Sequence, residues 1–353
     1  MKSSASTPAP GCIRRGSRNS PAAIPLAPTA SSDWRPGASL ETLKLRAGTL
    51  DRVRAFFSDR RVMEVETPLL AAAGVTDPHL ENLRTECRLP GRAAPVPLYL
   101  QTSPEYAMKR LLAAGAGPIY QITRAFRDGE AGRLHNPEFT LLEWYRPGFD
   151  MHDLMAEVED LLAWLLGTDF CDRTTYAAAF VKHAGFDPLL ISDDELRESM
   201  RQLGLNASAA ERWGRDDCLD WALSEIVAPR LGVERPLFLC HFPAGQSSLA
   251  RIISDENPPV AARFELFING IEIANGFEEL CDAGELRLRF EADNRARRAR
   301  GLEAAPIDER LLAALEHGLP ACAGVALGFD RLVMVAARCG RLDEVMAFDT
   351  SHA

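Results

Sequence analysis

The sequence predicts an α+β fold, in which an antiparallel sheet is flanked by helices. Strand-like runs occur as adjacent hairpins, and the helical segments do not alternate regularly with them, as they would in a doubly wound parallel sheet. The chain also lacks a Gly-x-Gly-x-x-Gly loop after a strand and a Gly-Lys-Ser/Thr phosphate loop, so neither a Rossmann site nor a P-loop is expected.

The first 37 residues differ from the rest because they are rich in Ser, Ala and Pro. Pro21, Pro25 and Pro28 interrupt any apolar core that a secretory signal would need. We expect a disordered leader over residues 1–37 or residues upstream of the true start, with a transit peptide as the weaker alternative.

Apolar residues recur at helical spacing from Leu40 to Arg60, and Val62–Thr67 then has the pattern of a short strand ended by Pro68. Ser103 and Pro104 predict the start of the next helix, with Ser as cap and Pro at the first helical position. That helix runs to about Ala114. Later helices are expected at Met151–Leu166, in most of Thr174–Arg235, at Asp282–Arg300 and Ile307–His317, and from Arg331 onward; Pro236–His241 is an expected strand.

Two alternating runs, Tyr120–Phe126 and Phe139–Tyr145, flank a basic loop and predict a hairpin. Such a hairpin can place Arg127 and His135 over one end of a nucleotide, with Phe139 stacked under the base. Arginine suits the phosphate end because it forms paired, charge-assisted hydrogen bonds. An ordinary hairpin with a solvated basic tip is the alternative.

A second hairpin is predicted around Asn269-Gly270, the strongest two-residue turn signal. If that turn closes the hairpin, Glu265 faces Ala274, and Glu265, Phe267, Glu272 and Ala274 share one face. Two carboxylates so close are unfavourable without a cation, and magnesium binds one or two carboxylates together with phosphate oxygens. The alternative is that one Glu pairs with an arginine while the other is solvated. The opposite face is wholly apolar and is expected in the core: Phe264, Leu266, Ile268, Ile271 and Ile273.

Composition limits the class of protein. A chain of 353 residues with 46% hydrophobic residues can bury a substantial core. Its net charge of −10 gives no footprint for nonspecific nucleic-acid binding. The eight scattered cysteines form no Cys-x-x-Cys pair, and no apolar run could span a bilayer, so a cytoplasmic protein with reduced cysteines and no membrane contact is expected. Six arginines between Asp282 and Arg300 are read as a solvated helix face, with contact to an acidic partner as the alternative.

Several long motifs occur in an order that resembles class II aminoacyl-tRNA synthetases. The stretch from Phe126 to Phe139 resembles the second signature of that class, and His135–Phe139 is similar to its lysyl branch. The whole chain from about Leu40 is closer still to the elongation factor P lysine ligases, stand-alone paralogues of lysyl-tRNA synthetase. The motifs are Thr102–Tyr106, Leu142–Pro147, His241–Ala244, Ile271–Phe277 and Gly324–Arg331.

This resemblance implies a class II synthetase-like catalytic domain over residues 38–353, with a mostly helical insert at about 153–235 and a homodimer. It implies ATP and Mg²⁺ as co-substrate and cofactor, and the following roles. Arg127 and Arg331 would be catalytic, Glu265 and Glu272 would hold the metal, and ATP would contact Arg127, Asp128, Gly129, His135, Asn136, Phe139, Glu272, Ile273, Gly328 and Arg331. The lysine-like substrate would contact Ser103, Pro104, Glu105, Tyr145, Glu279 and Ala274, with Glu143 assisting.

Two positions differ from the synthetase pattern. Ala274 stands where the resemblance to lysyl-tRNA synthetases implies Gly. A methyl group on the pocket floor would favour (R)-β-lysine over α-lysine by about 1–3 kcal/mol. Gly129 departs from the class II pattern, which has Glu there; the carboxylate stands instead at Glu130. The loop contacts of Asp128, Gly129 and Glu130 therefore differ from the class II pattern; either the backbone of the loop tip compensates for the shift, or activity is reduced.

The resulting hypothesis is an ATP-dependent ligase that joins (R)-β-lysine to a lysine ε-amine of translation elongation factor P. A truncated lysyl-tRNA synthetase is the alternative enzyme, but the Pro-rich segment before Leu40 is too short for an anticodon-binding barrel, so tRNA is not expected as a partner. A non-catalytic, synthetase-like regulator is the third reading, which the presence of both arginines and both metal carboxylates disfavours.

Overall fold

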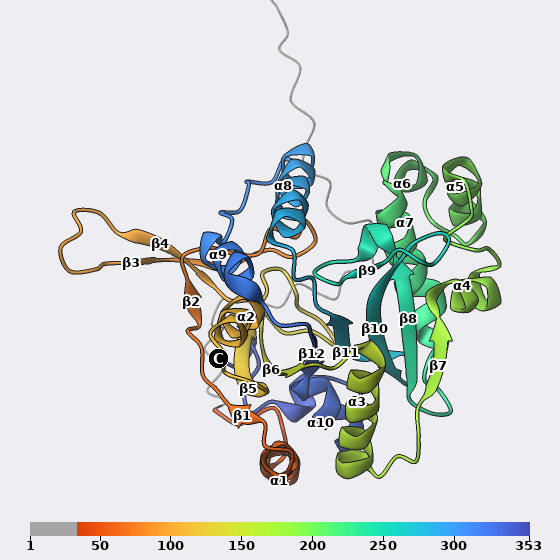
Figure 1. Ribbon diagram of the computed structural model, residues 1–353. Coiled ribbons are helices and arrows are strands. Elements are labelled where there is room, and N and C mark those ends of the chain that lie inside the picture. The colour runs from red at the N-terminus through yellow and green to blue at the C-terminus, as the bar shows by residue number, and fades with distance from the viewer. Residues whose placement is uncertain (1–33) are drawn as a thin grey trace, which may run out of the picture.

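A computed structural model of the chain describes residues 34–353 (Figure 1). Most of the expected leader, residues 1–33, lies outside the described residues. No helix among residues 34–353 is long and apolar enough to cross a membrane.

The fold is organised around a nine-stranded, mostly antiparallel sheet, as the sequence predicted. Its order is β1-β5-β6-β12-β11-β10-β8-β7, and β9 pairs with β10 beside this path. Two pairs, β1 with β5 and β7 with β8, are parallel. The strands are β1 (Met63–Glu64), β5 (Ile119–Phe126), β6 (Glu138–Pro147), β7 (Asp172–Thr175), β8 (Leu237–Pro243), β9 (Ile252–Ile253), β10 (Val260–Ile268), β11 (Ile271–Glu278) and β12 (Cys322–Gly328).

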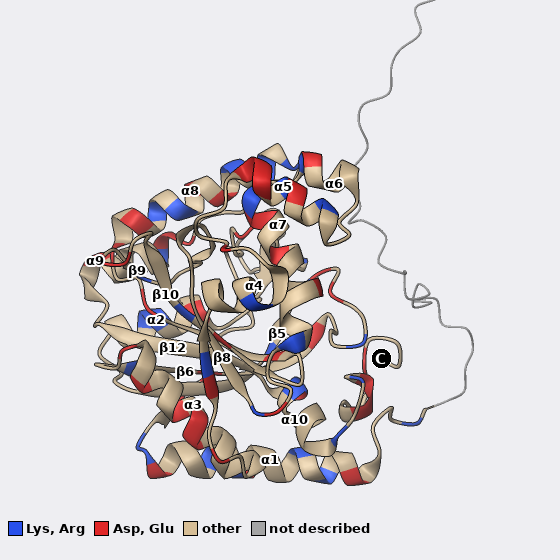
Figure 2. Cartoon of the chain, turned by 90° about the vertical axis from the view of Figure 1, so that its right-hand side faces the viewer, with Lys and Arg blue, Asp and Glu red and all other residues tan. Residues whose placement is uncertain are grey.

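Three helices cover one face of the sheet: α1 (Leu40–Asp59), α3 (Met151–Leu166) and α10 (Phe329–Ala337). Figure 2 shows α1 across the base of the molecule, below α3 and α10. Their apolar residues pack with Leu142 and Trp144 of β6 and Val325 and Leu327 of β12 in the largest core cluster. Because side chains of a strand alternate between faces, the neighbouring residues of β6 and β12 point to the opposite side of the sheet.

On that opposite side, α2 (Glu105–Ala113), α8 (Ala283–Ala299) and α9 (Glu309–Gly318) form one cluster with Tyr145. A second cluster lies over the β8 end of the sheet. It includes the helices between β7 and β8, which are α4 (Tyr176–Ala184), α5 (Asp193–Gln202), α6 (Ala207–Arg212) and α7 (Arg215–Ala222), followed by short turns at Leu223–Arg230. Between these two groups of helices, part of this face of the sheet is not covered by apolar core residues.

Local sequence signals explain where the helices begin and end. Asp150 and Asp153 form a capping box at the start of α3, and Gly167 ends that helix in the left-handed conformation. In α2 the prediction was wrong by one residue, because Pro104 takes the cap position. The Ser103 hydroxyl still accepts a hydrogen bond from the Glu105 amide at 3.1 Å. The strand expected at Val62–Thr67 is confined to the edge pair Met63–Glu64.

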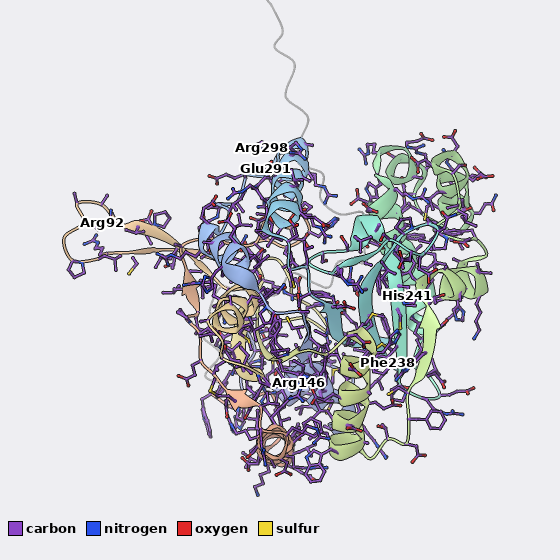
Figure 3. The ribbon with its side chains drawn as sticks, in the orientation of Figure 1. Arg92, Arg146, Phe238, His241, Glu291 and Arg298 are labelled. Carbon is purple, nitrogen blue, oxygen red and sulfur yellow. The ribbon has the colours of Figure 1, made fainter. Side chains whose placement is uncertain are left out.

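A small second sheet contains β2 (Leu70–Ala71), β3 (Arg84–Cys87) and β4 (Val96–Leu100) in the order β2-β4-β3. The β3–β4 hairpin projects from the body of the molecule, with Arg92 at its tip (Figures 1 and 3). Residues 72–82, which we call the 72–82 loop, connect β2 to β3.

The second predicted hairpin forms as β10 and β11, but its register is not the expected one. Asn269 and Gly270 have φ of 51° and 74°, so they make the tight turn that the sequence predicted. Ile268 faces Ile271 and Phe267 faces Glu272, again as predicted. A bulge between Leu266 and Phe267 then shifts the pairing, so Glu265 faces Asn275 and not Ala274.

Candidate active site

A cavity of about 1270 Å³ lies over the uncovered part of the sheet. Its walls come from β6, β10, β11 and β12, from α2, α7 and α8, and from the 72–82 loop and residues 244–249. A site for one small ligand has a volume of roughly 300–1,000 Å³, so this cavity has room for two substrates side by side.

One cross-strand row of residues forms the floor of the cavity. Glu143 of β6 faces Ala326 of β12, Ala326 faces Asn275 of β11, and Asn275 faces Glu265 of β10. All four line the cavity. Adjacent strands lie about 4.8 Å apart, so three strand steps separate Glu143 from Glu265 by roughly 14 Å. The floor therefore has two ends, which differ in their chemistry.

Arg127 lies where β5 ends and lines the cavity together with Phe139. Its guanidinium carbon is 5.0 Å from the centroid of the Phe139 ring, and its Nη1 is 3.8 Å from a carboxylate oxygen of Glu130. Of the three loop residues 128–130, Glu130 lines the cavity, whereas Asp128 and Gly129 do not. Gly129 has φ of 73°, a conformation that a Glu side chain would strain. The carboxylate thus reaches the cavity from the next residue.

Arg331 lies in the first turn of α10 and is tied to the same region of the cavity. Its guanidinium donates to the backbone oxygens of Glu272 at 2.9 Å and Leu134 at 3.2 Å. Its Nη2 is 2.8 Å from Nε2 of His135, and its Nη1 is 3.6 Å from the Glu272 carboxylate. Ile273 and Gly328 complete this wall.

Asn136 also lines the cavity, but its side chain is held by the C-terminal segment. Its Oδ1 accepts hydrogen bonds from the amide and hydroxyl of Thr350, at 3.1 and 3.0 Å. Its Nδ2 donates to the Glu138 carbonyl at 2.6 Å. The predicted nucleotide residues Arg127, His135, Asn136, Phe139, Glu272, Ile273, Gly328 and Arg331 therefore border one cavity.

Glu265 and Glu272 both line the cavity beside these groups. Burial, followed by the neighbouring Glu272 charge, raises the pKa of Glu265 to about 8, and the ion pair with Arg263 at 2.6 Å only partly opposes this. Among residues 34–353 no cluster of three or more metal-type side chains forms. Two carboxylates with phosphate oxygens and water match the ligand set of Mg²⁺, whose charge would relieve their repulsion.

The other end of the floor carries buried acids. Glu143 accepts hydrogen bonds from the hydroxyls of Ser103 at 2.8 Å and Tyr145 at 2.7 Å. Burial and the charge of Glu105 raise the pKa of Glu143 to about 7. Ser103, Pro104, Glu105 and Tyr145 line the cavity, as their predicted substrate role requires. Glu279 lies just behind this wall, where Lys109 pairs with both Glu105 and Glu279.

Ala274 is not on the floor of the cavity, so this part of the prediction was wrong. It is 2% exposed, packs in the large core cluster and faces Leu266 and Leu327. The bulge in the hairpin explains the error, because a one-residue shift turns a strand's side chains to the other face. Ala326 on β12 lies on the cavity floor instead.

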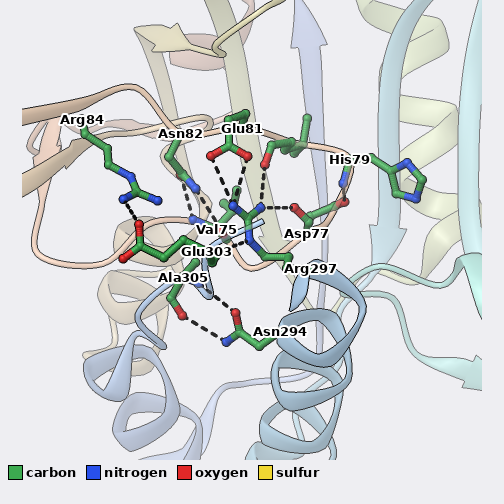
Figure 4. A network of polar contacts seen from close by, with 11 residues as sticks. Val75, Asp77, His79, Glu81, Asn82, Arg84, Asn294, Arg297, Glu303 and Ala305 are labelled. Carbon is green, nitrogen blue, oxygen red and sulfur yellow. Dashed lines mark hydrogen bonds and ion pairs between the residues drawn. The ribbon is translucent and has the colours of Figure 1, made fainter. Parts of the chain in front are cut away.

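Helix α8 holds two loops over the cavity through its arginines. Arg297 is fully buried and donates to the carbonyls of Asp77 at 3.1 Å and Glu303 at 2.8 Å (Figure 4). It also pairs with Glu81 at 3.0 Å. Arg289 donates to the carbonyls of Ser248 and Ala250, at 2.7 and 2.9 Å. The expectation of a wholly solvated face is therefore wrong, although Arg298 is exposed at the end of the helix (Figure 3).

Sequence reasoning missed four side chains of this site: Lys109, Asp220, Arg263 and Asn275. Lys109 had a detectable signal, since Glu105 stands four residues before it on a helix. Arg263 donates to Asn275 at 3.3 Å and pairs with Glu265, contacts that depend on the bulge. Asp220 comes from α7, far away in the sequence, and burial raises its pKa to about 6.

Comparison with known proteins agrees with this architecture. The family model of tRNA synthetases class II (D, K and N) matches residues 30–352. A protein of Edwardsiella ictaluri named elongation factor P--(R)-beta-lysine ligase is 52% identical over 322 residues, which cover 91% of this chain and 99% of that protein. Proteins with the same name from Pectobacterium atrosepticum and Proteus mirabilis are 51% and 52% identical, with coverage of 92% and 91% of this chain and 99% of each relative. The chain therefore belongs to the class II tRNA synthetases of the D, K and N type and, within them, to the family of elongation factor P--(R)-beta-lysine ligases.

Proposed function

We propose that this protein is an ATP-dependent ligase that activates (R)-β-lysine and transfers it to a lysine ε-amine of translation elongation factor P. The observation that carries the proposal is a single cavity with two different ends. Arg127, Arg331, Glu265 and Glu272 border one end, and Glu105 and Glu143 border the other. The first set suits a metal-bound triphosphate, and the second suits a substrate with positively charged amines.

In the first step a carboxylate oxygen of β-lysine attacks the α-phosphorus of ATP. The bond from that phosphorus to the bridging oxygen breaks, and pyrophosphate leaves with the bonding electrons. The two guanidinium groups stabilise the charge on the phosphate oxygens, and Phe139 offers a stacking surface for the adenine. Mg²⁺ held by Glu265 and Glu272 would neutralise further phosphate charge. Positioning and charge are sufficient, and no protein base is needed.

In the second step the neutral ε-amine of the acceptor lysine attacks the acyl carbon of the adenylate. An amide forms, AMP leaves, and the amine releases one proton. The name that the relatives share supports the choice of both the acyl group and the acceptor. We further propose that the enzyme works in the cytoplasm as a homodimer and makes no aminoacyl-tRNA.

The decisive experiment offers the purified protein ATP, Mg²⁺, (R)-β-lysine, elongation factor P and tRNA together, and measures the masses of the products. We expect elongation factor P to gain one β-lysyl group while tRNA stays uncharged. A charged tRNA would identify a lysyl-tRNA synthetase instead, and no product on either acceptor would favour a non-catalytic regulator.

A variant pair tests the assigned chemistry. Arg331→Ala should reduce lysine-analogue-dependent pyrophosphate exchange by about 10²-fold or more, as expected for a lost transition-state charge contact. Arg338→Ala, at the exposed end of the same helix, is the matched control and should keep full exchange. Undiminished exchange in Arg331→Ala would contradict the role of Arg331.

A further inference from the structure

A cation that the proposed chemistry does not use lies behind the end of the cavity that Glu105 and Glu143 border. Lys109 lies on α2 and its side chain is 1% exposed. Its Nζ is 2.7 Å from Oε1 of Glu105 and 2.5 Å from Oε2 of Glu279. The other described lysines, Lys44 and Lys182, are exposed. A buried ammonium between two carboxylates is expensive to assemble and demands an explanation.

The charges around Lys109 do not balance. Three carboxylates meet there: the charge of Glu105 acts on Glu143, and the charges of Glu105 and Glu143 both act on Glu279. With one lysine, the fully ionised set carries a net charge of minus two. The remaining titratable groups that face it are Tyr106, Tyr145, Cys281 and Cys322, and burial raises the pKa of each, so they stay neutral near pH 7.

The set also has unused acceptor capacity. The Glu279 side chain is completely buried; Lys109 engages its Oε2, whereas its Oε1 has no hydrogen-bond partner. A Cβ placed on Gly324 would lie 2.4 Å from Oε1 of Glu279, and Gly324 lines the cavity. The missing side chain thus leaves this oxygen next to the cavity wall, where a ligand's donor can reach it.

We propose that Lys109 is a positioning residue that fixes the charge of the fully ionised subsite at minus two and so makes it selective for ligands with two ammonium groups. This inference deepens the proposed function and rests on it for the identity of the natural ligand. Lys109 neutralises one carboxylate and holds Glu105 and Glu279 in place. Two charges then remain for the ligand, and a ligand with a single ammonium leaves one buried carboxylate uncompensated.

Protonation gives the proposal a measurable signature. Burial would lower the pKa of Lys109, but Glu105 and Glu279 outweigh it and hold that pKa above its ordinary value. Burial raises the pKa of Glu279 to about 8 and that of Glu143 to about 7. The empty subsite therefore holds protons near neutral pH and releases them when a diammonium ligand binds. Loss of the Lys109 charge would raise these pKa values further.

The test uses calorimetric binding of 1,5-diaminopentane and of pentylamine to the full chain between pH 6 and pH 9. The native protein should bind the diamine at least about tenfold more tightly than the monoamine, with affinity that rises through pH 7–8. In Lys109→Met the acids retain their protons at neutral pH. The preference for the diamine over the monoamine should therefore fall below about threefold, and the rise in affinity should occur about one pH unit higher. Lys182→Met, an exposed lysine on α4, should behave like the native protein.

Two results would overturn the proposal. One is a native protein that binds the diamine no better than the monoamine. The other is a Lys109→Met variant that keeps both the diamine preference and the rise in affinity between pH 7 and pH 8. The second would show that Lys109 is structural only. If Lys109→Met does not fold, Glu279→Gln tests the same charge count by removing one negative charge. This variant should lose the diamine preference, and its affinity should rise at a lower pH than in the native protein. If both the preference and the pH of the rise stay unchanged, the proposal is again overturned.

Pyrophosphate exchange measured in parallel separates this inference from the proposed function. If the native protein prefers the diamine but shows no exchange with any lysine analogue, the role of Lys109 stands and the ligase assignment is refuted. If the native protein shows exchange with β-lysine but binds the diamine and the monoamine equally, the ligase assignment stands and the role of Lys109 is refuted.

Discussion

Glu143 lies at one end of the cavity floor, one strand away from Ala326 and in hydrogen-bond contact with two hydroxyl groups. Because burial and Glu105 raise its pKa to about 7, the folded chain holds this proton more tightly than the unfolded chain does. The corresponding stability is complete below the unfolded pKa of about 4.5 and is lost as pH rises through about 7.

Glu143→Gln should therefore flatten the pH dependence of stability in the substrate-free protein. One carboxylate contributes at most about 1.4 kcal/mol per pH unit to the slope of the unfolding free energy. The measurement is denaturant or thermal unfolding between pH 5 and pH 8. Glu138→Gln, exposed on the same strand, is the control. An unchanged slope in Glu143→Gln would show that Glu143 does not carry the titration.

Ala274 provides a second test at this scale, because the structure moves it from the pocket to the core. Ala274→Gly should cost about 1–2 kcal/mol of stability, through the lost methyl burial and the greater chain entropy of glycine. The selectivity between α-lysine and β-lysine should stay the same. Ala326→Gly, on the cavity floor, should instead change that selectivity, by about 1–3 kcal/mol in kcat/KM. Altered selectivity in Ala274→Gly would mean that the bulge is misplaced.

At the scale of elements, α8 connects the catalytic sheet to its covering loops. Figure 2 shows acidic and basic residues along this helix, and its arginines have separate tasks. Arg297 satisfies backbone carbonyls of the 72–82 loop, and Arg300 pairs with Asp217 of α7 at 2.8 Å. Asn294 exchanges two hydrogen bonds with Ala305, at 3.0 and 2.8 Å, which fixes the segment after α8 (Figure 4).

Arg297→Met should loosen the 72–82 loop while the sheet stays folded. The lost hydrogen bonds leave carbonyls unsatisfied, which should destabilise the protein by about 2–4 kcal/mol. Hydrogen exchange should accelerate in residues 72–82, and KM for both substrates should rise. Arg298→Met removes the exposed neighbouring arginine and should leave all three quantities unchanged. Equal protection of the loop in both variants would contradict this account.

At the scale of the whole molecule, exposed apolar side chains gather on the early part of the chain. Leu40 and Leu45 of α1, Met63 of β1 and Leu70 of β2 are 71%, 40%, 49% and 43% exposed. Large exposed apolar groups of this kind mark protein interfaces. We propose that this surface forms the contact of the homodimer that the family resemblance implies.

The double variant Met63→Asp with Leu70→Asp should convert the dimer to a monomer, because charges in an apolar interface lose hydration without a partner. Light scattering after size-exclusion chromatography measures this change. Leu190→Asp, at a 73% exposed leucine after α4, should remain dimeric. A native protein that is monomeric at micromolar concentration would remove the dimer from the proposal.

Much of this architecture could be predicted because its signals are local. Asn269 and Gly270 specify a turn by their own backbone preferences, and Gly167 ends α3 for the same reason. The α+β class, the hairpin that carries Arg127 and Phe139, and the membership in the synthetase family all follow from such patterns. The motif residues that border the cavity were likewise recognisable by type and order.

The sequence by itself determined which elements form and which kinds of side chain the protein brings to its site. Only the tertiary structure decided which of them meet. The bulge that pairs Glu265 with Asn275 and sends Ala274 into the core depends on contacts across strands, so the alternation along one strand could not reveal it. Lys109 and Arg297 are buried only because α2 and α8 pack as they do, and the charge of a buried group depends on neighbours that are distant in the sequence.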